Sequence, residues 1–433
     1  MYKALRKIVL AAIFTLFISG NSKAQTYVLI PDANFATYLQ GLVPSAMSGN
    51  SLNITSTLVT TGIQAMTPSV NIANLSGIQY FTSLTSLNCS YNPLTSLPTL
   101  PNSITFLACS GCYLTSLPAL PSSLASLYCD ANSLTSLPTL PNSLTYLDCR
   151  FNSLTNLPAL PNSITYLSCG HNSLTTLPAL PNSLTTFYCN SNSLTHLPLL
   201  PNSITQIVCT YNSLSSMPSL PSSLASLFCN SNSLTSLPAL PNSLDYLNCD
   251  FNSLTSLPAL PNSLTHLQCL YNSLTSLPAL PNSLISLYCE NNLISCFPVF
   301  PISISYLFLD PNPYNCLPNY VLPAMYNYTT IPLCTPGNSN GCPVGIGISE
   351  LNPTKFHVSV YPNPSKCSFS IKVDDEINNG EIILINSIGQ VIYTSDIKRG
   401  ENKITTGITA SGLYQYIILQ NKQPFGRGKL VIE

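Results

Sequence analysis

Hydrophobic residues in the central part of the chain recur with a period of 20 residues. One unit reads Leu144-x-x-Leu147-x-Cys149-x-x-Asn152-x-Leu154-x-x-Leu157-Pro158-x-Leu160-Pro161, and repeat positions are numbered below from its first leucine. About twelve such units run from residue 84 to residue 323. A fixed period of this length is the signature of a solenoid, in which each repeat forms one coil.

The spacing within a unit predicts one short strand per repeat. Leu147 and Cys149 alternate with polar residues, so a strand directs both side chains to the same face. Pro158 and Pro161 exclude a helix on the return path and favour extended or polyproline geometry. Stacked copies join their strands, ~4.8 Å apart, into a sheet over a continuous leucine core. The asparagine at the ninth position is polar, so we expect it to hydrogen-bond backbone groups in the turns.

The string LxxLxCxxNxLxxLPxLPxS resembles the leucine-rich repeat, in the short bacterial form that carries an LPxLP segment. The resemblance covers more than half of the chain. It implies a β-rich solenoid with a parallel sheet on the concave side and an extended or polyproline path on the convex side. It also implies recognition of a protein or a glycan.

The third, fifth, seventh and eighth positions of each repeat are expected to point out of the concave face. Between Leu114 and Asn292 every aromatic residue except Phe187 occupies one of these positions, as do most charged residues of the array. Exposed Tyr and Phe offer large and fairly rigid contact areas. The alternative is that aromatic residues fit β-surfaces and shield one another across strands. The predicted ligand-binding residues are Tyr128, Tyr146, Asp148, Arg150, Phe151, Tyr166, Tyr188, Tyr211, Phe228, Tyr246, Phe251, Tyr271 and Tyr288.

The sequence contains no recognisable catalytic group. Asp130, Arg150 and His171 fall close together in three successive repeats, and we interpret them as an ion pair with a nearby histidine rather than a charge relay. His196 and His266 have no neighbours with metal-ligand spacing. We therefore expect a protein that is not an enzyme, with no cofactor and no metal.

Cysteine occupies the sixth position of eleven repeats, from Cys89 to Cys289. We interpret these cysteines as small buried hydrophobic residues, and Cys112 as a substitute in the asparagine position. Four further cysteines lie outside this series at the C-terminal end of the array: Cys296, Cys316, Cys334 and Cys342. One or two disulfides are expected among them, and the sequence leaves the pairing open.

The N-terminal residues 1–24 have the pattern of a cleaved signal peptide, with a basic start, an apolar run from Ile8 to Gly20 and small residues before Gln25. The apolar run is too short to span a bilayer, and no later segment is long enough. Residues 25–83 are expected to form a cap with a degenerate repeat. It includes an amphipathic helix that Asp32 caps, and it covers the first core layer.

Residues 324–355 are expected to form a C-terminal cap and linker. Beyond them, residues 356–433 alternate in the manner of strands and predict a small β-sandwich. This segment resembles the type A sorting domain of the type IX secretion system. The residues that carry the resemblance are Tyr361, Pro362, Asn363, Pro364, Gly389, Gly412, Tyr414 and Lys429. The resemblance implies export by that machinery, in a bacterium of the Bacteroidota kind, to the outer cell surface or the medium.

Charge narrows the class of partner. Between Gln25 and Thr354 the one Lys or Arg is Arg150, against eight acidic residues, so the array lacks the basic surface that binds nucleic acid or anionic lipid. The sequence therefore predicts a secreted or cell-surface recognition or adhesion protein that binds an unknown protein or glycan ligand. A structural surface protein without a specific ligand is the alternative.

Overall fold

The computed structural model describes residues 25–68, 71–321, 328, 330–335, 342, 358–366, 368–373, 377, 379–386, 391–408, 410–420 and 423–433. The predicted signal peptide, most of the predicted linker and Gly389 lie outside these residues. The chain divides into two compact units, Met1–Leu194 and Thr195–Glu433, which are described separately. Among the described residues, no helix is long and apolar enough to cross a membrane.

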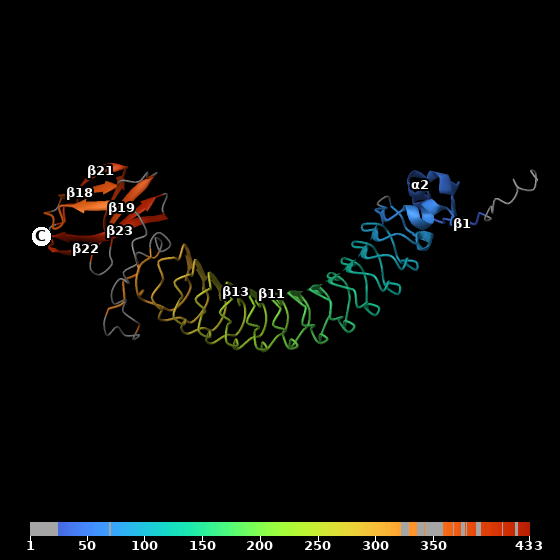
Figure 1. Ribbon diagram of the computed structural model, residues 1–433. Helices are drawn as coiled ribbons and strands as arrows, with labels where there is room; N and C mark the ends of the chain where they lie inside the picture. Colours follow the sequence, from blue (N-terminus) through green and yellow to red (C-terminus); the bar gives the residue numbers. More distant parts are fainter. Residues whose placement is uncertain are drawn as a thin grey trace, which may run out of the picture. The chain divides into compact units, whose positions relative to one another are not determined.

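The first unit begins with the predicted cap (Figure 1). Helix α2 (Ala33–Leu42) starts where the Asp32 carboxylate accepts a hydrogen bond from the backbone N–H of Phe35 at 2.9 Å, which confirms the predicted N-cap. The second carboxylate oxygen of Asp32 accepts the backbone N–H of Ala73 at 2.7 Å. This one side chain therefore ties the helix to the segment that precedes the first regular repeat.

The cap also contains a small antiparallel sheet and three short helical turns. The sheet has the order β1-β3-β2. Its strands are β1 (Tyr27–Leu29), β2 (Met47–Ser48) and β3 (Ser51–Asn53), and the turns are η1 (Pro44–Ala46), η2 (Leu58–Gly62) and η3 (Ile78–Tyr80). Phe35, Leu39 and Leu52 are fully buried, so the cap has an apolar centre of its own.

Parallel strands follow one another in the first unit, one in each repeat. They are β4 (Ala65–Met66), β5 (Ser86–Asn88), β6 (Phe106–Ala108), β7 (Ser126–Tyr128), β8 (Tyr146–Asp148), β9 (Tyr166–Ser168) and β10 (Thr186–Tyr188). Neighbouring strands pair in step, as Leu127 does with Leu147 and Leu147 with Leu167. Because paired residues of neighbouring strands are 20 positions apart, the length of one repeat, every position of one repeat lies beside its equivalent in the next.

The second unit continues the same pattern with β11 (Gln206–Val208), β12 (Ser226–Phe228), β13 (Tyr246–Asn248), β14 (His266–Gln268), β15 (Ser286–Tyr288) and β16 (Tyr306–Phe308). These strands are also parallel and in step. Between the strands, the described return segments contain no helix, as their prolines require. The predicted parallel solenoid of about twelve coils is therefore confirmed.

The asparagine at the ninth position bonds the turns together. The side-chain amide of Asn152 donates to the carbonyl oxygens of Cys129 and Cys149 at 3.0 and 3.1 Å, and its oxygen accepts the backbone N–H of Leu134 at 2.9 Å. Asn132, Asn232 and Asn252 make equivalent bonds. The predicted role of this asparagine in the turns is confirmed.

The repeat cysteines are buried thiols, as expected. All twelve free cysteines among the described residues, including Cys112, are buried. The Cys149 thiol donates to the carbonyl of Ser168 in the next repeat at 3.5 Å, and burial raises the pKa of the Cys209 thiol to about 12. Cys112 stands in the asparagine position and points its thiol at the carbonyl of Cys89.

The C-terminal residues of the second unit form a separate β-fold. A three-stranded sheet has the order β17-β18-β21 and a four-stranded sheet the order β20-β19-β22-β23. The strands are β17 (Val358–Tyr361), β18 (Ser368–Val373), β19 (Gly380–Ile385), β20 (Val391–Ile397), β21 (Gly400–Thr405), β22 (Gly412–Gln420) and β23 (Gln423–Ile432), all antiparallel. Side chains of both sheets, such as Phe369 and Ile418, share one core, which confirms the predicted β-sandwich.

Candidate functional site

The third, fifth, seventh and eighth positions of the repeats lie on the side of the parallel sheet opposite the buried leucines, and we call this side the sheet face. In the first unit it is hollowed into an open groove of about 460 Å³ over β5 to β8. The groove is lined by Thr67, Asn88, Ser90, Tyr91, Phe106, Ala108, Ser110, Tyr128, Asp130, Tyr146, Asp148 and Arg150. Four of the predicted binding residues, Tyr128, Tyr146, Asp148 and Arg150, therefore come together here.

Aromatic rings form a continuous row across five strands of the first unit. Tyr128 stacks on Tyr146 with ring centroids 4.6 Å apart, and Tyr146 on Tyr166 at 4.2 Å with an interplanar angle of 4°. Phe106 closes one end of the row at 5.5 Å in a tilted contact, and Tyr188 the other end at 5.6 Å, edge to face. The central rings thus cover one another's faces, and their side chains are half-buried.

Arg150 forms its ion pair with a different residue from the one expected. Its Nε lies 3.1 Å from the carboxylate of Asp148, two residues earlier in the same repeat, so the expected pairing with Asp130 is wrong. His171 belongs to the eighth position and stacks on Phe151 at 4.1 Å. Positions five and seven of one strand segment point to the same side, which places Asp148 and Arg150 together.

The two carboxylates of the groove have different environments. Asp148 is 1% exposed, and burial raises the pKa of its carboxyl, while the backbone N–H and the charge of Arg150 lower it and the charge of Asp130 raises it further. Asp130 accepts a hydrogen bond from the Ser110 hydroxyl. Arg150 compensates one carboxylate only, so the groove carries a net negative charge.

The eighth position has an unusual backbone. In ten repeats its residue is not glycine and has φ between 51° and 60°, in the left-handed region. Bulky residues rarely adopt this conformation, which costs them about 1–2 kcal/mol. The exposed aromatic residues held there are Tyr91, Phe151, Tyr211, Phe251 and Tyr271.

The second unit carries shorter aromatic rows on its part of the sheet face. Phe228 stacks on Tyr246 at 4.8 Å and Tyr246 on His266 at 5.4 Å. Tyr288 stacks on Phe308, and Phe251 on Tyr271 at the eighth position. The remaining predicted aromatic residues are therefore on the sheet face as well, but outside the groove of the first unit.

Sequence analysis missed several residues of the groove, among them Tyr91, Phe106 and Ser110. Tyr91 and Phe106 precede Leu114, where the predicted aromatic surface begins, although they occupy the same eighth and third positions. Ser110 is at the seventh position, where a small polar residue gives no signal by itself. Extending the aromatic pattern to the first two repeats would have found Tyr91 and Phe106.

Asp250 gives the second unit a pH-dependent stability. This side chain is 7% exposed, and burial raises the pKa of its carboxyl from 3.8 to about 7. Between about pH 4 and pH 7 the Asp250 carboxyl is therefore protonated in the folded protein but ionised in the unfolded chain. Because ionisation favours the unfolded chain, the free energy of unfolding falls as the pH rises through this range. We expect the free energy of unfolding of Asp250→Asn to exceed that of the parent by up to about 4 kcal/mol at pH 8, with a correspondingly higher unfolding temperature. At pH 4 the two proteins should be equally stable.

Thermal unfolding of both proteins from pH 4 to pH 8 measures this difference. Asn retains an oxygen that can accept the backbone N–H of Leu270, which bonds to Asp250 at 2.9 Å. Asp245→Asn is the control because Asp245 is exposed, and it should leave the difference from the parent constant across the same range. A constant difference for Asp250→Asn would contradict the prediction.

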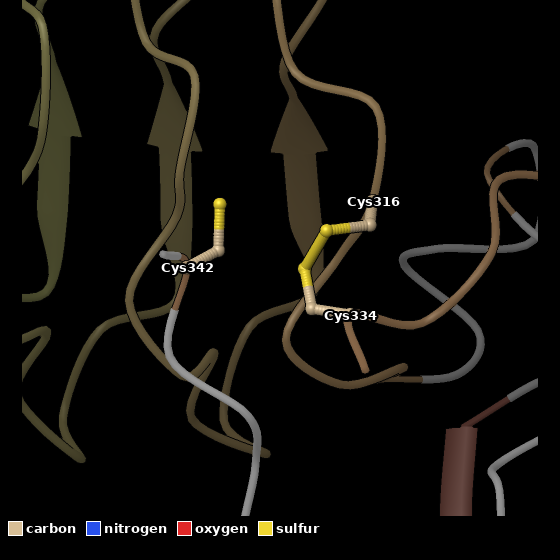
Figure 2. Close-up of side chains that lie close together, drawn as sticks. All are labelled: Cys316, Cys334 and Cys342. Carbon is tan, nitrogen blue, oxygen red and sulfur yellow. A yellow bond between two sulfur atoms is a disulfide. The ribbon is translucent and has the colours of Figure 1, made fainter. Parts of the chain in front are cut away.

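Two disulfides join the four cysteines at the end of the array. Cys296 pairs with Cys342 and Cys316 with Cys334, which settles the pairing that the sequence left open. Figure 2 shows Cys316, Cys334 and Cys342 gathered at this place, with their sulfur atoms within 4.8 Å of one another. Because both disulfides occupy these sulfurs, they are not available as thiolate ligands for a metal.

The sorting-motif residues that the structure describes lie within the β-sandwich. Asn363 donates from its side-chain amide to the carbonyl of Lys429 at 2.9 Å and accepts the backbone N–H of Val431 at 2.8 Å. The Tyr414 hydroxyl donates to the carbonyl of Ala410. The segment that contains Tyr361, Pro362 and Pro364 is thus fastened by Asn363 to β23.

Comparison with known proteins supports both parts of the chain. Residues 359–433 match the family described as the secretion system C-terminal sorting domain. YopM from Yersinia enterocolitica WA-314 is 34% identical, with a TM-score of 0.50 over 55% of this chain and 58% of that chain, so slightly more than half of its length is matched. YopM from Yersinia pestis, titled a leucine-rich effector protein, is also 34% identical, with a TM-score of 0.50 over 61% of this chain and 79% of that one. No curated protein matches.

These findings bear on the export of the protein and on its binding role. The sorting domain indicates a secreted protein attached to the cell surface, and it implies contact with the secretion machinery. The solenoid suggests a protein-binding role. The chain belongs to the leucine-rich-repeat family, and its residues 359–433 are a secretion-system C-terminal sorting domain.

Proposed function

We propose that this protein is a cell-surface recognition or adhesion protein that binds an extracellular protein through its sheet face, and that it is not an enzyme. The observation that carries the proposal is the set of exposed aromatic side chains held at left-handed backbone positions beside the sheet. Asn or Gly would occupy those positions at lower conformational cost. A surface that keeps Tyr and Phe there despite the cost favours a binding role.

The stacking geometry supports a protein ligand over a glycan. A sugar ring packs on the open face of an aromatic side chain, whereas Tyr146 is stacked on both sides, by Tyr128 and Tyr166. What these rings offer to a ligand is edges and phenol hydroxyl groups. Such groups suit the mixed polar and apolar surface of a protein.

The chemistry of the groove supports binding without catalysis. Its one hydroxyl next to a carboxylate is that of Ser110, which donates to Asp130, and no histidine is among the described groove residues. An activated nucleophile needs a base that takes its proton and a third group that orients the base. Asp148 is instead engaged by Arg150.

A structural surface role is the second candidate. Aromatic stacks between neighbouring repeats stabilise a sheet by themselves, at about 0.5–1.5 kcal/mol for each pair. This role predicts no specific ligand and tolerance of substitutions on the sheet face.

The test uses the mature protein and a triple variant, Tyr91→Asn, Phe151→Asn and Tyr211→Asn. Asn is favoured in the left-handed region, so the variant is expected to be at least as stable as the parent. The control carries Tyr27→Asn and Tyr113→Asn, two exposed tyrosines outside the four sheet-face positions.

Binding of all three proteins is measured on an array of extracellular and matrix proteins, on a glycan array and on intact cells. We expect the parent and the control to bind a protein that the triple variant does not bind. Binding to glycans alone would refute the protein ligand. Equal binding by all three proteins, or none, would favour the structural role.

A further inference from the structure

We propose that the groove of the first unit receives an arginine or lysine side chain from a peptide segment of the partner, with Asp130 as its counter-ion. This inference rests on the proposed function and specifies its ligand. It follows from three features of the groove, which are its charge, its open aromatic ring and its short polar side chains.

Charge is the first feature. Asp148 is paired with Arg150, whereas the partner of the Asp130 carboxylate in the described part of the chain is the neutral hydroxyl of Ser110. Arg150 is also the one Lys or Arg between Gln25 and Thr354, so no other basic side chain of the array can neutralise Asp130. A cation from a partner would complete a charge-assisted hydrogen bond and remove the net negative charge.

Tyr91 supplies the second feature. Its side chain is 82% exposed and lies over Gly111, where a Cβ atom would come within 2.6 Å of the ring. Glycine at this point, with φ of 63°, thus leaves room for the Cδ1–Cε1 edge of the ring, while the ring remains open to solvent. A guanidinium or ammonium group placed over an aromatic face is attracted by the ring.

The third feature is the polar floor of the groove. Asn88, Ser90 and Ser110 contribute short hydrogen-bonding side chains at the fifth and seventh positions. A volume of about 460 Å³ is in the range of sites that hold small ligands. The phenol groups of Tyr128 and Tyr146 add further acceptors along one side. Together these groups match a basic side chain and the backbone next to it.

Charge over the whole array agrees with this choice. Eight acidic residues stand against one arginine between Gln25 and Thr354, so a basic segment would be steered toward this surface. An acidic peptide would meet the uncompensated Asp130 and is excluded by the same argument.

The experiment selects ligands without assuming their sequence. A random peptide library displayed on phage is selected on the mature protein and depleted on the Tyr91→Asn variant, which alters the groove. We expect the enriched peptides to share an Arg or Lys. A synthetic copy in which citrulline replaces that Arg, or Gln that Lys, should bind at least about tenfold more weakly by fluorescence anisotropy.

Two matched variants then locate the counter-ion. Asp130→Asn keeps an oxygen for the Ser110 hydroxyl and should weaken the selected peptide by at least about tenfold. Asp245→Asn removes the same charge from an exposed residue outside the sheet-face positions and should bind as the parent does. Enriched peptides without a basic residue, full binding by Asp130→Asn, or the absence of any groove-dependent peptide would overturn the inference.

The two proposals fail in different ways. A protein partner that the triple variant loses but Asp130→Asn retains would leave the recognition function standing and refute the basic ligand. Absence of any partner and of any peptide would refute both.

Discussion

Replacing Asn152 by Ala is expected to lower the free energy of unfolding by about 3 kcal/mol. The side chain donates to three carbonyl oxygens, those of Cys129, Cys149 and Arg150, and accepts one backbone N–H, that of Leu134. Alanine leaves the backbone N–H of Leu134, a buried residue, without this acceptor. Urea or thermal unfolding of the mature protein measures the loss.

Two control variants distinguish the loss of these turn hydrogen bonds from the effect of replacing any asparagine of the array. Asn162→Ala changes an exposed asparagine of the return path in the same array and should stay within about 0.5 kcal/mol of the parent. Asn152→Cys imitates the natural Cys112, whose thiol lies 3.5 Å from the carbonyl of Cys89, and should be less destabilising than Asn152→Ala. Equal stability of the parent and Asn152→Ala would show that the asparagines do not hold the turns.

Removing the disulfide between Cys296 and Cys342 is expected to destabilise the end of the array by about 4 kcal/mol, and removing that between Cys316 and Cys334 by about 3 kcal/mol. The difference follows from the sequence separations of 46 and 18 residues, since a longer closed loop restricts the unfolded chain more. The Cys296→Ser, Cys342→Ser variant should therefore unfold at a lower temperature and be cleaved sooner by protease near Cys316.

Reductant provides the control for this prediction. A thiol reductant should lower the unfolding temperature of the parent but not that of a variant with Ser at all four cysteines. The twelve repeat thiols are buried and should not react with an alkylating agent until the array unfolds. An unfolding temperature of the parent that reductant leaves unchanged would contradict the stabilising role of the disulfides.

Sequence analysis predicted the solenoid well because a single repeat determines its own coil. The spacing of the repeat puts Leu147, Cys149 and Asn152 at the same places in the coil as their equivalents in the other copies. Each of them therefore packs or bonds in the same way as those equivalents. The first strand of the parallel sheet, Ala65–Met66, was not anticipated because the repeat pattern is degenerate in the cap segment. In the sorting domain, the alternating pattern predicted strands over 368–373, 381–386, 390–394, 413–419 and 429–432 and missed β17 and β21. Strand β21 (Gly400–Thr405) is mostly polar, and Ile404 is its one buried residue.

The site was less predictable, because it depends on orientation within a face. The sequence placed Arg150 on the sheet face but did not identify its ion-pair partner. Asp130 lies one repeat before Arg150 and Asp148 two residues before it, and the structure pairs Arg150 with Asp148. Nor could it show that Tyr128 and Tyr146 stack although they occupy the fifth and third positions. Stacking of such rings depends on side-chain rotation, which a position count does not contain.

The register of the strands bears on how such a protein changes over generations. The ninth-position asparagines, the repeat cysteines and the strands bond within their own repeat and to the adjoining repeats, and the partner groups are the same backbone atoms from one regular repeat to the next. A recombination event that deletes or duplicates one whole 20-residue segment would therefore recreate the same bonds at the junction, whereas a segment of another length would not. A lineage with this gene can thus extend, shorten or reorder its outer contact surface in single genetic steps, while the interior needs no compensating mutation.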